Sequence, residues 1–350
     1  MGDTTILAPS VQELAKQGIH KVPQQYLQPN QDPVLVSNIT SLTQLPIINL
    51  DKLLFEDDNE FEKLDQACKE WGFFQLINHG VDPSLVESVK IGVQEFFNLP
   101  MEEKKKFWQT EKELQGFGQL YVLKEQSLHW GDMFLVRTFP LHTRLPHLLP
   151  CIPQPFRDNL ENYSLELKKL CFTIIKFMAK ALKIQQTSEM LDFFKEGVQN
   201  IRMGYYPPCP QPDKVIGLNP HSDGSGLTIL LQVNDIQGLQ VKKDGLWIPI
   251  APLPNAFVFN VGDQLEIMTN GIYRSIEHRV TVDSKKERIS IAAFHDIEMG
   301  KDLTPASSLV TPESPALYKT ITVEEYIAGL LVSKVEGKSY LDVVRIKNEI

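Results

Sequence analysis

Three side chains in the C-terminal half of the chain have the types and order expected of a metal site. His221 and Asp223 are separated by one residue, and His278 follows much later. Two imidazoles and one carboxylate can occupy one face of an octahedral ion and leave three positions open for other ligands. This ligand set is typical of non-haem iron(II) centres, and the sequence predicts one here.

A second pair of residues indicates how the open positions would be used. Arg288 and Ser290 follow His278 and are again separated by one residue. A guanidinium holds a carboxylate through two parallel hydrogen bonds, and a hydroxyl can add a third. The combination predicts a bidentate acid co-substrate, with one end chelating the metal and the other end on Arg288.

Strand geometry restricts how these residues can meet. Residues i and i+2 of a strand point to one face, so the third metal ligand has to come from a second strand. The alternating segment 273–282 carries His278, and the segment 287–295 forms the next strand. In a simple hairpin of the two, Arg288 and Ser290 would face away from His278. We therefore expect the two strands in opposite sheets of a jelly roll, in which consecutive strands can change sheet.

Composition excludes several other classes of protein. The chain has 350 residues, 42% of them hydrophobic, and a net charge of −9. A core of this size suits one large domain or two smaller ones, and the acidic balance makes nucleic acid an unfavourable partner. The cysteines show no CxxC spacing, which indicates a reducing compartment. Without a signal pattern or a membrane-length apolar run, we expect a cytoplasmic protein that has no membrane partner.

The rest of the chain is expected to support these strands with helices. A capping box starting at Ser10 predicts a short helix to about Gly18. Apolar periodicity predicts further helices, over 61–71, 84–99, 101–108, 158–184, 188–196 and 318–335, with a short one after Ser339. Strands are expected over 45–50, 73–77, 130–135 and 201–206, and then on to 296. The segments 116–118 and 146–155 are predicted to be loops, and His79 is interpreted as a turn residue.

The motifs together resemble one enzyme family, the plant 2-oxoglutarate/Fe(II)-dependent dioxygenases. The resemblance covers roughly residues 5–345 and rests on the metal and carboxylate motifs together with 70–75, 78–81, 204–210, 254–257 and 260–263. The segments 9–16, 67–72, 96–99 and 140–142 are similar to the senescence-related-gene type and to the poppy alkaloid O-demethylases.

The resemblance implies a fold and its parts. It implies a mainly β protein with flanking helices, built on a double-stranded β-helix (jelly-roll) core with a mixed α/β N-terminal region. The parts would be an N-terminal arm (1–43), an N-terminal dioxygenase region (44–157), support helices (158–197), the Fe(II)/2-oxoglutarate core (198–300) and a C-terminal helical segment (301–350).

The family also implies roles for residues and cofactors. Fe(II) would lie on His221, Asp223 and His278. The far carboxylate of 2-oxoglutarate would rest on Arg288 and Ser290, with the hydroxyl of Tyr206 donating nearby. O2 and a small molecule would be the other substrates, ascorbate would support activity, and the enzyme would act as a monomer. Candidate substrate-facing residues are Tyr121, Met133, Leu135 and Phe294, although simple core packing is an open alternative for each.

Two glycines depart from the family pattern. Many relatives carry asparagine in place of Gly204, two residues before Tyr206, so 2-oxoglutarate binding is expected to be weaker or assisted by water. Gly224 follows the metal motif directly and indicates either a roomier pocket or a plain turn.

The implied reaction is oxidation of a C–H bond. Halogenating relatives lack the carboxylate of Asp223, so hydroxylation, O-demethylation or desaturation is expected. The expected substrate is a hydrophobic plant specialised metabolite such as an alkaloid, and the alternative is a flavonoid or another phenolic. The rival interpretations are an ethylene-forming type of oxidase, which uses no 2-oxoglutarate, and a jelly-roll binding protein without catalysis.

Overall fold

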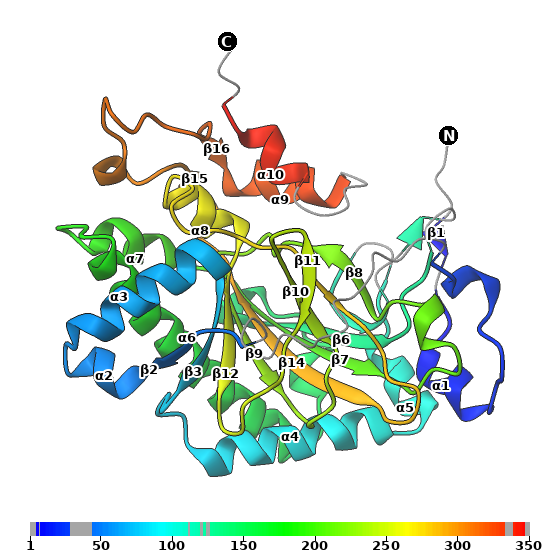
Figure 1. The fold of residues 1–350 in the computed structure, drawn as a ribbon. Helices are drawn as coiled ribbons and strands as arrows, with labels where there is room; N and C mark the ends of the chain where they lie inside the picture. The colour runs from blue at the N-terminus through cyan, green and yellow to red at the C-terminus, as the bar shows by residue number, and fades with distance from the viewer. Residues whose placement is uncertain are drawn as a thin grey trace.

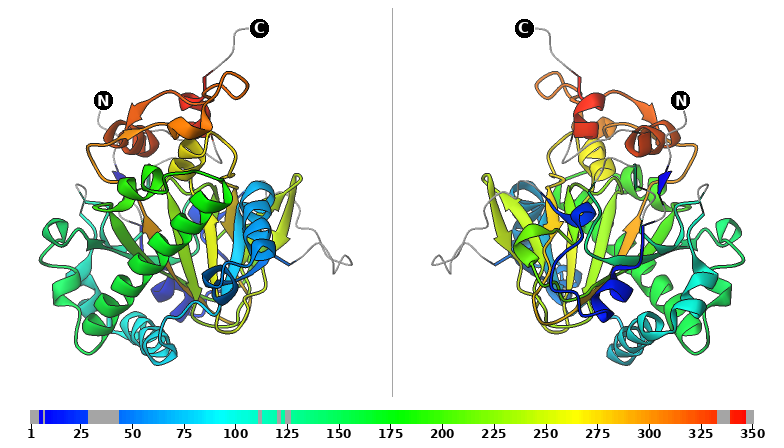
Figure 2. Two further views of the ribbon diagram at one scale, coloured as in Figure 1. Left: turned by 90° about the vertical axis from the view of Figure 1, so that its left-hand side faces the viewer. Right: turned by 90° about the vertical axis from the view of Figure 1, so that its right-hand side faces the viewer.

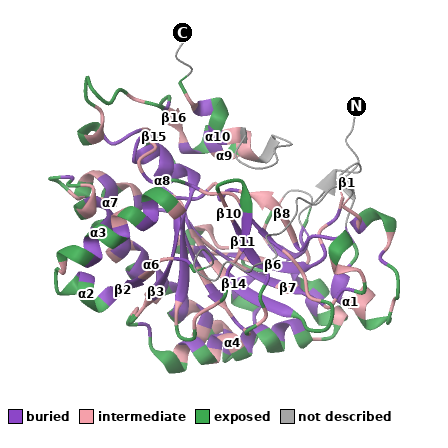
Figure 3. Cartoon of the chain, in the orientation of Figure 1, coloured by how far each residue is buried: buried purple, intermediate pink, exposed green. Residues whose placement is uncertain are grey.

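The protein is a sandwich of two β-sheets flanked by helices (Figure 1). The computed structural model describes residues 5–6, 8–28, 44–110, 113–119, 122–123, 127–332 and 339–346. Apolar residues of the strands are buried, whereas the outer faces of the helices are exposed (Figure 3). This distribution places the main hydrophobic core between the sheets and the helices.

The larger sheet has eight strands. Their order is β2 (Ile47–Asn49), β3 (Phe73–Ile77), β12 (Phe257–Val261), β9 (Leu227–Gln232), β14 (Arg288–His295), β7 (Gln199–Tyr206), β6 (Asp132–Phe139) and β4 (Gly116–Gly118). Among the strand pairs of this sheet that the structure describes, β2 and β3 pair in parallel and the others are antiparallel. The N-terminal region therefore extends the sheet of the jelly roll at both of its edges.

The smaller sheet has four strands and carries the two histidines of the metal motif. Their order is β11 (Leu246–Pro249), β10 (Leu239–Lys243), β13 (His278–Val280) and β8 (Leu218–His221). β13 and β14 are consecutive in the chain but belong to different sheets. The expectation that these strands lie in opposite sheets is confirmed, and with it the jelly-roll core.

Helices cover the outer face of the larger sheet. The longest is α6 (Phe156–Ala181), which packs on β9 and β14 and buries one apolar stripe. Its 26 residues span about 39 Å at 1.5 Å per residue, and each fully buried leucine of the stripe contributes about 1.5–3 kcal/mol. The other helices of this layer are α2 (Leu50–Leu54), α3 (Asp58–Gln66) with its π-helical continuation (Ala67–Trp71), α4 (Pro83–Asn98), α5 (Met101–Lys104) and α7 (Ser188–Phe194).

The N-terminal segment 8–28 packs against the ends of β6 and β7 and beside α5 (Figure 2). α1 (Val11–Lys16) starts at Ser10, whose hydroxyl accepts a hydrogen bond from the backbone N–H of Glu13, as the capping box predicts. The carboxylate of Asp132 on β6 also accepts hydrogen bonds from the Ser10 hydroxyl and from the N–H groups of Val11 and Gln12. These contacts fix the segment against β6.

The C-terminal segment lies over α8 (Asp263–Met268), as the orange and red ribbon in Figure 1 shows. It consists of β15 (Asp302–Leu303), β16 (Ile321–Thr322), α9 (Val323–Val332) and α10 (Ser339–Val344). Glu266 of α8 is fully buried and accepts hydrogen bonds from Tyr318, Arg345 and the backbone N–H of Ser275. The buried carboxylate of Glu266 therefore holds the C-terminal segment against α8 through Tyr318 and Arg345.

Some element predictions were wrong. The segment 116–118 forms the edge strand β4, although its two glycines predict a loop. Gly116 has a φ of 123°, and a Cβ there would lie 2.8 Å from the carbonyl oxygen of Phe107, so glycine is what allows this strand to form. The helix predicted over 318–335 begins only at Val323, since 321–322 pairs with β15. No helix in the described ranges combines the length and apolarity needed to cross a bilayer.

Candidate metal centre and co-substrate cavity

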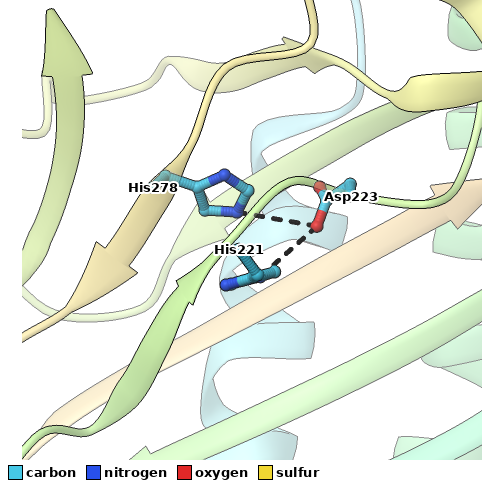
Figure 4. A group of neighbouring side chains, drawn as sticks. All are labelled: His221, Asp223 and His278. Atoms are coloured by element: carbon cyan, nitrogen blue, oxygen red, sulfur yellow. Dashed lines mark ion pairs between the residues drawn. The ribbon is translucent and has the colours of Figure 1, made fainter. Parts of the chain in front are cut away.

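The three candidate ligands converge on one point (Figure 4). His221 ends β8 and lies directly opposite His278, the first residue of β13. Asp223 lies in the loop that follows β8 and not on the strand itself, where its spacing from His221 predicts it. Its Oδ1 lies 3.5 Å from the Nε2 atoms of both histidines. Neighbouring ligands about 2.1 Å from an octahedral ion are roughly 3 Å apart, so the three atoms can hold a small divalent ion after a slight contraction.

Hydrogen bonds orient each of these side chains. The Nδ1 atoms of His221 and His278 face backbone carbonyl oxygens, at 2.8 Å and 3.2 Å, which turns both Nε2 atoms toward the common point. The Oδ2 of Asp223 accepts hydrogen bonds from the Thr228 hydroxyl at 2.6 Å and from the Asn260 amide at 2.7 Å, which leaves Oδ1 for a metal. Such supporting contacts tune the affinity of a metal site.

Thr228 and Asn260 are functional residues that the sequence does not reveal. Asn260 begins a segment that carries the family resemblance, but nothing in that segment connects it to Asp223, and a threonine in an apolar strand carries no signal of its own. Both residues lie on the larger sheet, on β9 and β12, directly opposite one another. Only the paired register shows that they reach the same carboxylate.

The protonation states suit metal binding. Burial alone would raise the pKa of the Asp223 carboxyl, but His278, His221 and the hydrogen bond from Thr228 outweigh burial and hold that pKa below its ordinary range. Burial lowers the pKa of His278 to about 4, and the neighbouring His221 contributes to this shift. A charged carboxylate and a neutral imidazole are the forms that bind a metal.

The carboxylate clamp is assembled on two neighbouring strands. Arg288 on β14 is only 1% exposed and lies opposite Tyr206 on β7, with its guanidinium 5.5 Å from the centre of the tyrosine ring. Its Nη1 donates to the Ser290 hydroxyl at 3.2 Å, whereas its buried Nε has no hydrogen-bond partner. Across the described part of the chain, Arg288 forms no ion pair. A buried cation without a counter-anion is unfavourable, so the residues present fit an anionic co-substrate.

One cavity of about 60 Å³ joins the candidate metal ligands to Arg288 and Ser290. The polar side chains of Arg202, Tyr206, Thr228 and Asn260 also line this cavity. Apolar side chains form much of the remaining wall: Phe73, Leu218, Leu230, Leu239, Val280 and Phe294. A larger hollow of about 270 Å³ lies near α4, but neither the candidate metal ligands nor the clamp line it. The small cavity is therefore where a metal and a dicarboxylate can be held together.

The four candidate substrate residues differ in their positions. Phe294 lines the metal cavity. Met133 lines a smaller neighbouring cavity and pairs with Gly204. Leu135 is half-buried on the same face of β6, but it lines neither cavity. Tyr121 lies outside the described residues.

Two further histidines occupy structural positions. His295 is buried and its Nε2 lies 2.8 Å from the Gln199 amide nitrogen. His79 accepts a hydrogen bond from the backbone N–H of Val81 through its Nδ1. Both contacts agree with structural roles for these two side chains.

The two unusual glycines have different surroundings. A Cβ on Gly204 would lie 3.1 Å from the ring and the hydroxyl of Tyr206, so the tyrosine occupies the space that a side chain at 204 would enter. A Cβ on Gly131 or Gly217 would lie even closer to the same ring, at 2.7 Å and 2.8 Å. A Cβ on Gly224 would collide with Leu330 of α9. Gly224 therefore lets the C-terminal helix approach the metal loop and does not open a larger pocket.

Comparisons with known proteins agree with this geometry. The 2OG-Fe(II) oxygenase superfamily model matches residues 197–297, and a model described as the non-haem dioxygenase in morphine synthesis N-terminal region matches residues 45–151. Protein SRG1 of Arabidopsis thaliana is 53% identical, over 98% of both chains. Oxoglutarate-dependent flavonoid 7-O-demethylase 1 of Ocimum basilicum is 50% identical, over 97% of this chain and 91% of the relative.

Two further similarities extend over nearly the whole chain. Codeine O-demethylase of Papaver somniferum is 49% identical, over 97% of this chain and 96% of the relative. The crystal structure of JOX2 in complex with 2OG, Fe and JA superposes with a TM-score of 0.89 at 34% identity, over 97% of this chain and 98% of the other.

The jelly-roll core, the His-Asp-His cluster and the unpaired buried arginine define an Fe(II)-dependent oxygenase that uses a keto-acid co-substrate. With relatives about half identical over the full length, the chain belongs to the 2-oxoglutarate/Fe(II)-dependent oxygenase family. Its cofactors are accordingly Fe(II) and 2-oxoglutarate.

Proposed function

We propose that this oxygenase oxidises a C–H bond of a hydrophobic plant specialised metabolite, by O-demethylation or hydroxylation. The observation that carries the proposal is the buried Arg288, which has no ion-pair partner among the described residues and shares one cavity with His221, Asp223 and His278. In the proposed arrangement these three residues hold Fe(II). Arg288, with Ser290 and Tyr206 as further donors, holds the far carboxylate of 2-oxoglutarate.

Bound iron and 2-oxoglutarate would supply the oxidation, in which O2 and the keto acid give succinate, CO2 and one oxygen atom inserted into the substrate C–H bond. The protein's residues do the positioning. Thr228 and Asn260 fix the carboxylate of Asp223, Arg288 sets the direction of the co-substrate, and the apolar wall excludes water. If the carbon belongs to a methoxy group, the hydroxylated product is a hemiacetal that separates into formaldehyde and an alcohol.

Relatives support O-demethylation in particular. Two proteins that are about half identical over nearly the full length are named as O-demethylases, one of a flavonoid and one of codeine. We therefore propose an O-methylated alkaloid or O-methylated flavonoid as the substrate, lying at the mouth of the cavity against Phe294, with Met133, Leu135 and Tyr121 as further candidates. We also expect a monomeric enzyme of the cytoplasm.

The first test needs no substrate. 2-Oxoglutarate is titrated without oxygen into the Fe(II)-loaded protein while the visible metal-to-ligand charge-transfer band is followed. We expect the band in the parent protein and its loss or strong weakening in Arg288→Leu. Arg157→Leu, which removes a cation from the surface of α6, should leave the band unchanged. No band despite bound iron would refute the proposed arrangement.

The second test addresses the reaction. The enzyme is incubated with O2, 2-oxoglutarate and a panel of O-methylated alkaloids and flavonoids, and succinate and formaldehyde are quantified. O-Demethylation predicts equal amounts of the two products. Succinate with a hydroxylated product and no formaldehyde would show hydroxylation instead.

A further inference from the structure

A buried carboxylate connects the C-terminal helix α9 to the metal loop (222–226), which carries Asp223. Oδ2 of Asp263 accepts a hydrogen bond from the hydroxyl of Tyr326 on α9, at 2.8 Å, and another from the hydroxyl of Ser222, at 3.2 Å. Asp263 is 1% exposed and Tyr326 is fully buried, which strengthens both bonds because the surroundings screen charge poorly. Tyr326 is thus joined to the residue that precedes Asp223.

The backbone of the metal loop is held by the start of α8. The N–H of Asp263 donates to the carbonyl oxygen of Asp223 at 2.7 Å, and the N–H of Gly262 donates to that of Gly226 at 2.9 Å. A Cβ on Gly262 would collide with the carbonyl oxygen of Ser225, so the two segments are in close contact. A shift of Asp263 would therefore be transmitted to Asp223.

The residue that follows Asp223 is also covered by α9. A Cβ on Gly224 would collide with Cδ2 of Leu330. Leu330 follows Tyr326 by four residues, so these two side chains lie on one face of the helix. That face of α9 contacts the residues on both sides of Asp223, one directly and the other through Asp263.

A second tyrosine of the C-terminal segment contacts α8 at a different acid. Tyr318 donates to Oε1 of Glu266 at 2.8 Å, the same length as the bond from Tyr326 to Asp263. The other hydrogen bonds that Glu266 accepts come from Ser275 and Arg345, which lie outside the metal loop. The chain therefore contains two similar tyrosine–carboxylate contacts, of which the one made by Tyr326 is joined to the loop of Asp223.

We propose that Tyr326 and Leu330 are positioning residues for Asp223, and that docking of α9 strengthens the binding of Fe(II). The proposal rests on the metal site proposed above and extends it to a helix whose two side chains do not line the metal cavity. Oδ1 of Asp223 lies 3.5 Å from the Nε2 atoms of both histidines and has to approach them to roughly 3 Å when a metal binds. Contacts that hold the metal loop in place reduce the cost of this contraction.

The size of the effect follows from the position of the contacts. Losing a bond made by the metal-binding carboxylate itself costs about 10- to 100-fold in metal affinity. Tyr326 acts through Asp263, so removing its hydroxyl should weaken Fe(II) binding by about 3- to 10-fold, the range of one hydrogen bond. By reciprocity, bound Fe(II) should stabilise the docked position of α9 by at least the same factor.

The first experiment compares the two tyrosines. Fe(II) affinity is measured without oxygen in a competition with a chelating dye, for the parent, Tyr326→Phe and Tyr318→Phe. Tyr326→Phe should raise the Kd by about 3- to 10-fold and move the maximum of the charge-transfer band formed with 2-oxoglutarate. Tyr318→Phe should leave the Kd within about twofold and the band unmoved, although thermal unfolding should show a similar loss of stability in both variants.

A double-mutant cycle tests the contact at Gly224. Gly224→Ala forces Leu330 or the metal loop to move and should raise the Kd for Fe(II) by about 3- to 10-fold. Adding Leu330→Ala makes room for the new methyl group. The double variant should therefore bind Fe(II) more tightly than Gly224→Ala alone, which is the non-additivity expected of residues in contact.

Hydrogen exchange tests the link from the side of the metal. Exchange of the backbone amides of α9 is followed by mass spectrometry without ligands and with Fe(II) and 2-oxoglutarate. Exchange in α9 should slow by at least about threefold in the loaded protein. The amides of α1, which docks on Asp132, are the internal control and should keep their rate.

Four results would overturn the proposal. An unchanged Kd and band in Tyr326→Phe, or an equal weakening in Tyr318→Phe, would show that Tyr326 does not position the metal ligand. Additive effects in the cycle would show that Leu330 does not act through Gly224, and equal exchange of α9 with and without the metal would exclude the link. Failure of the proposed metal site would instead appear in the parent protein, as absent Fe(II) binding and a missing band.

Discussion

Replacing Arg288 by methionine should stabilise the ligand-free protein and at the same time abolish its response to 2-oxoglutarate. Arg288 is 1% exposed, and its Nε has no hydrogen-bond partner. Exchanging a buried, uncompensated charge for an apolar side chain is expected to add about 1–2 kcal/mol to the free energy of unfolding. For 350 residues, about 2.1 cal/mol/K of unfolding entropy per residue converts each kcal/mol into about 1.4 °C of Tm.

The stabilisation of the metal-loaded protein by 2-oxoglutarate should decrease in the same variant. At a concentration of one hundred times its Kd, 2-oxoglutarate stabilises the metal-loaded parent by about 2.7 kcal/mol, which raises Tm by about 4 °C. Removing the partner of a buried charged contact costs about 3–4 kcal/mol of binding, so the Kd rises by about 200- to 1,000-fold. At the same concentration the variant should then gain less than about 0.5 °C.

Differential scanning calorimetry under anaerobic conditions, with and without 2-oxoglutarate, measures both effects. Arg279→Met is the matched comparison for the ligand-free state, because Arg279 is also buried, at 2% exposure, but donates to Gln240 at 2.8 Å and lies over the ring of Trp247. Its loss should lower Tm. If Arg288→Met lowers the ligand-free Tm as Arg279→Met does, the charge of Arg288 is compensated and the reasoning fails.

Three other perturbations test separate parts of the structure. Thr228→Val removes one hydrogen bond to Oδ2 of Asp223 and should weaken Fe(II) binding about 10- to 100-fold in a competition with a chelating dye; unchanged affinity would contradict a supporting role. Gly204→Asn introduces a Cβ 3.1 Å from the ring of Tyr206 and should lower the free energy of unfolding by about 1–3 kcal/mol in urea, whereas a neutral result would show that the ring can move. Burial lowers the pKa of His295 to about 4, so its contribution to stability is complete above its ordinary pKa of about 6.5 and is lost as pH falls toward 4, by up to about 1.4 kcal/mol per pH unit. His295→Gln should flatten this acid-side slope in urea titrations between pH 7 and 4.5, and an unaltered slope would assign the acid sensitivity to other groups.

Strand alternation was enough to predict how the site is divided between sheets. The one-residue spacing of Arg288 and Ser290 placed both on one face, and their conflict with His278 in a hairpin excluded the simplest topology. The structure has this division, with β13 in the smaller sheet and β14 in the larger one. The division could be predicted because the side-chain alternation of a strand is a local property that does not depend on the rest of the fold.

Contacts between distant segments could not be predicted in this way. α8 lies in a stretch where the sequence predicts strands, and it contains Asp263 and Glu266, whose side chains are both buried although carboxylates are seldom fully buried. They are hydrogen-bonded by Tyr326 and Tyr318 of the C-terminal segment. No local pattern indicates which tyrosine reaches which acid, because that depends on how the last part of the chain folds back.

The same limitation applied to the metal site. The ligand types could be predicted from spacing, but the donors Thr228 and Asn260 are supplied by strands that become neighbours only in the folded sheet. Arg202 carries no sequence signal of its own because a basic residue in a strand commonly points to solvent. Its unpartnered Nε is visible only in the structure.

The distribution of the site over two sheets also links its two ligands thermodynamically. His221 and His278 belong to the smaller sheet. Asp223 is hydrogen-bonded to Thr228 of the larger sheet, and Arg288 is also part of the larger sheet. An ion on the proposed ligands would therefore connect the sheets, and a dicarboxylate reaching from that ion to Arg288 would connect them a second time. Each ligand would thus favour the sheet spacing that the other requires. By reciprocity, iron would raise the affinity for the co-substrate by the same factor by which the co-substrate raises the affinity for iron.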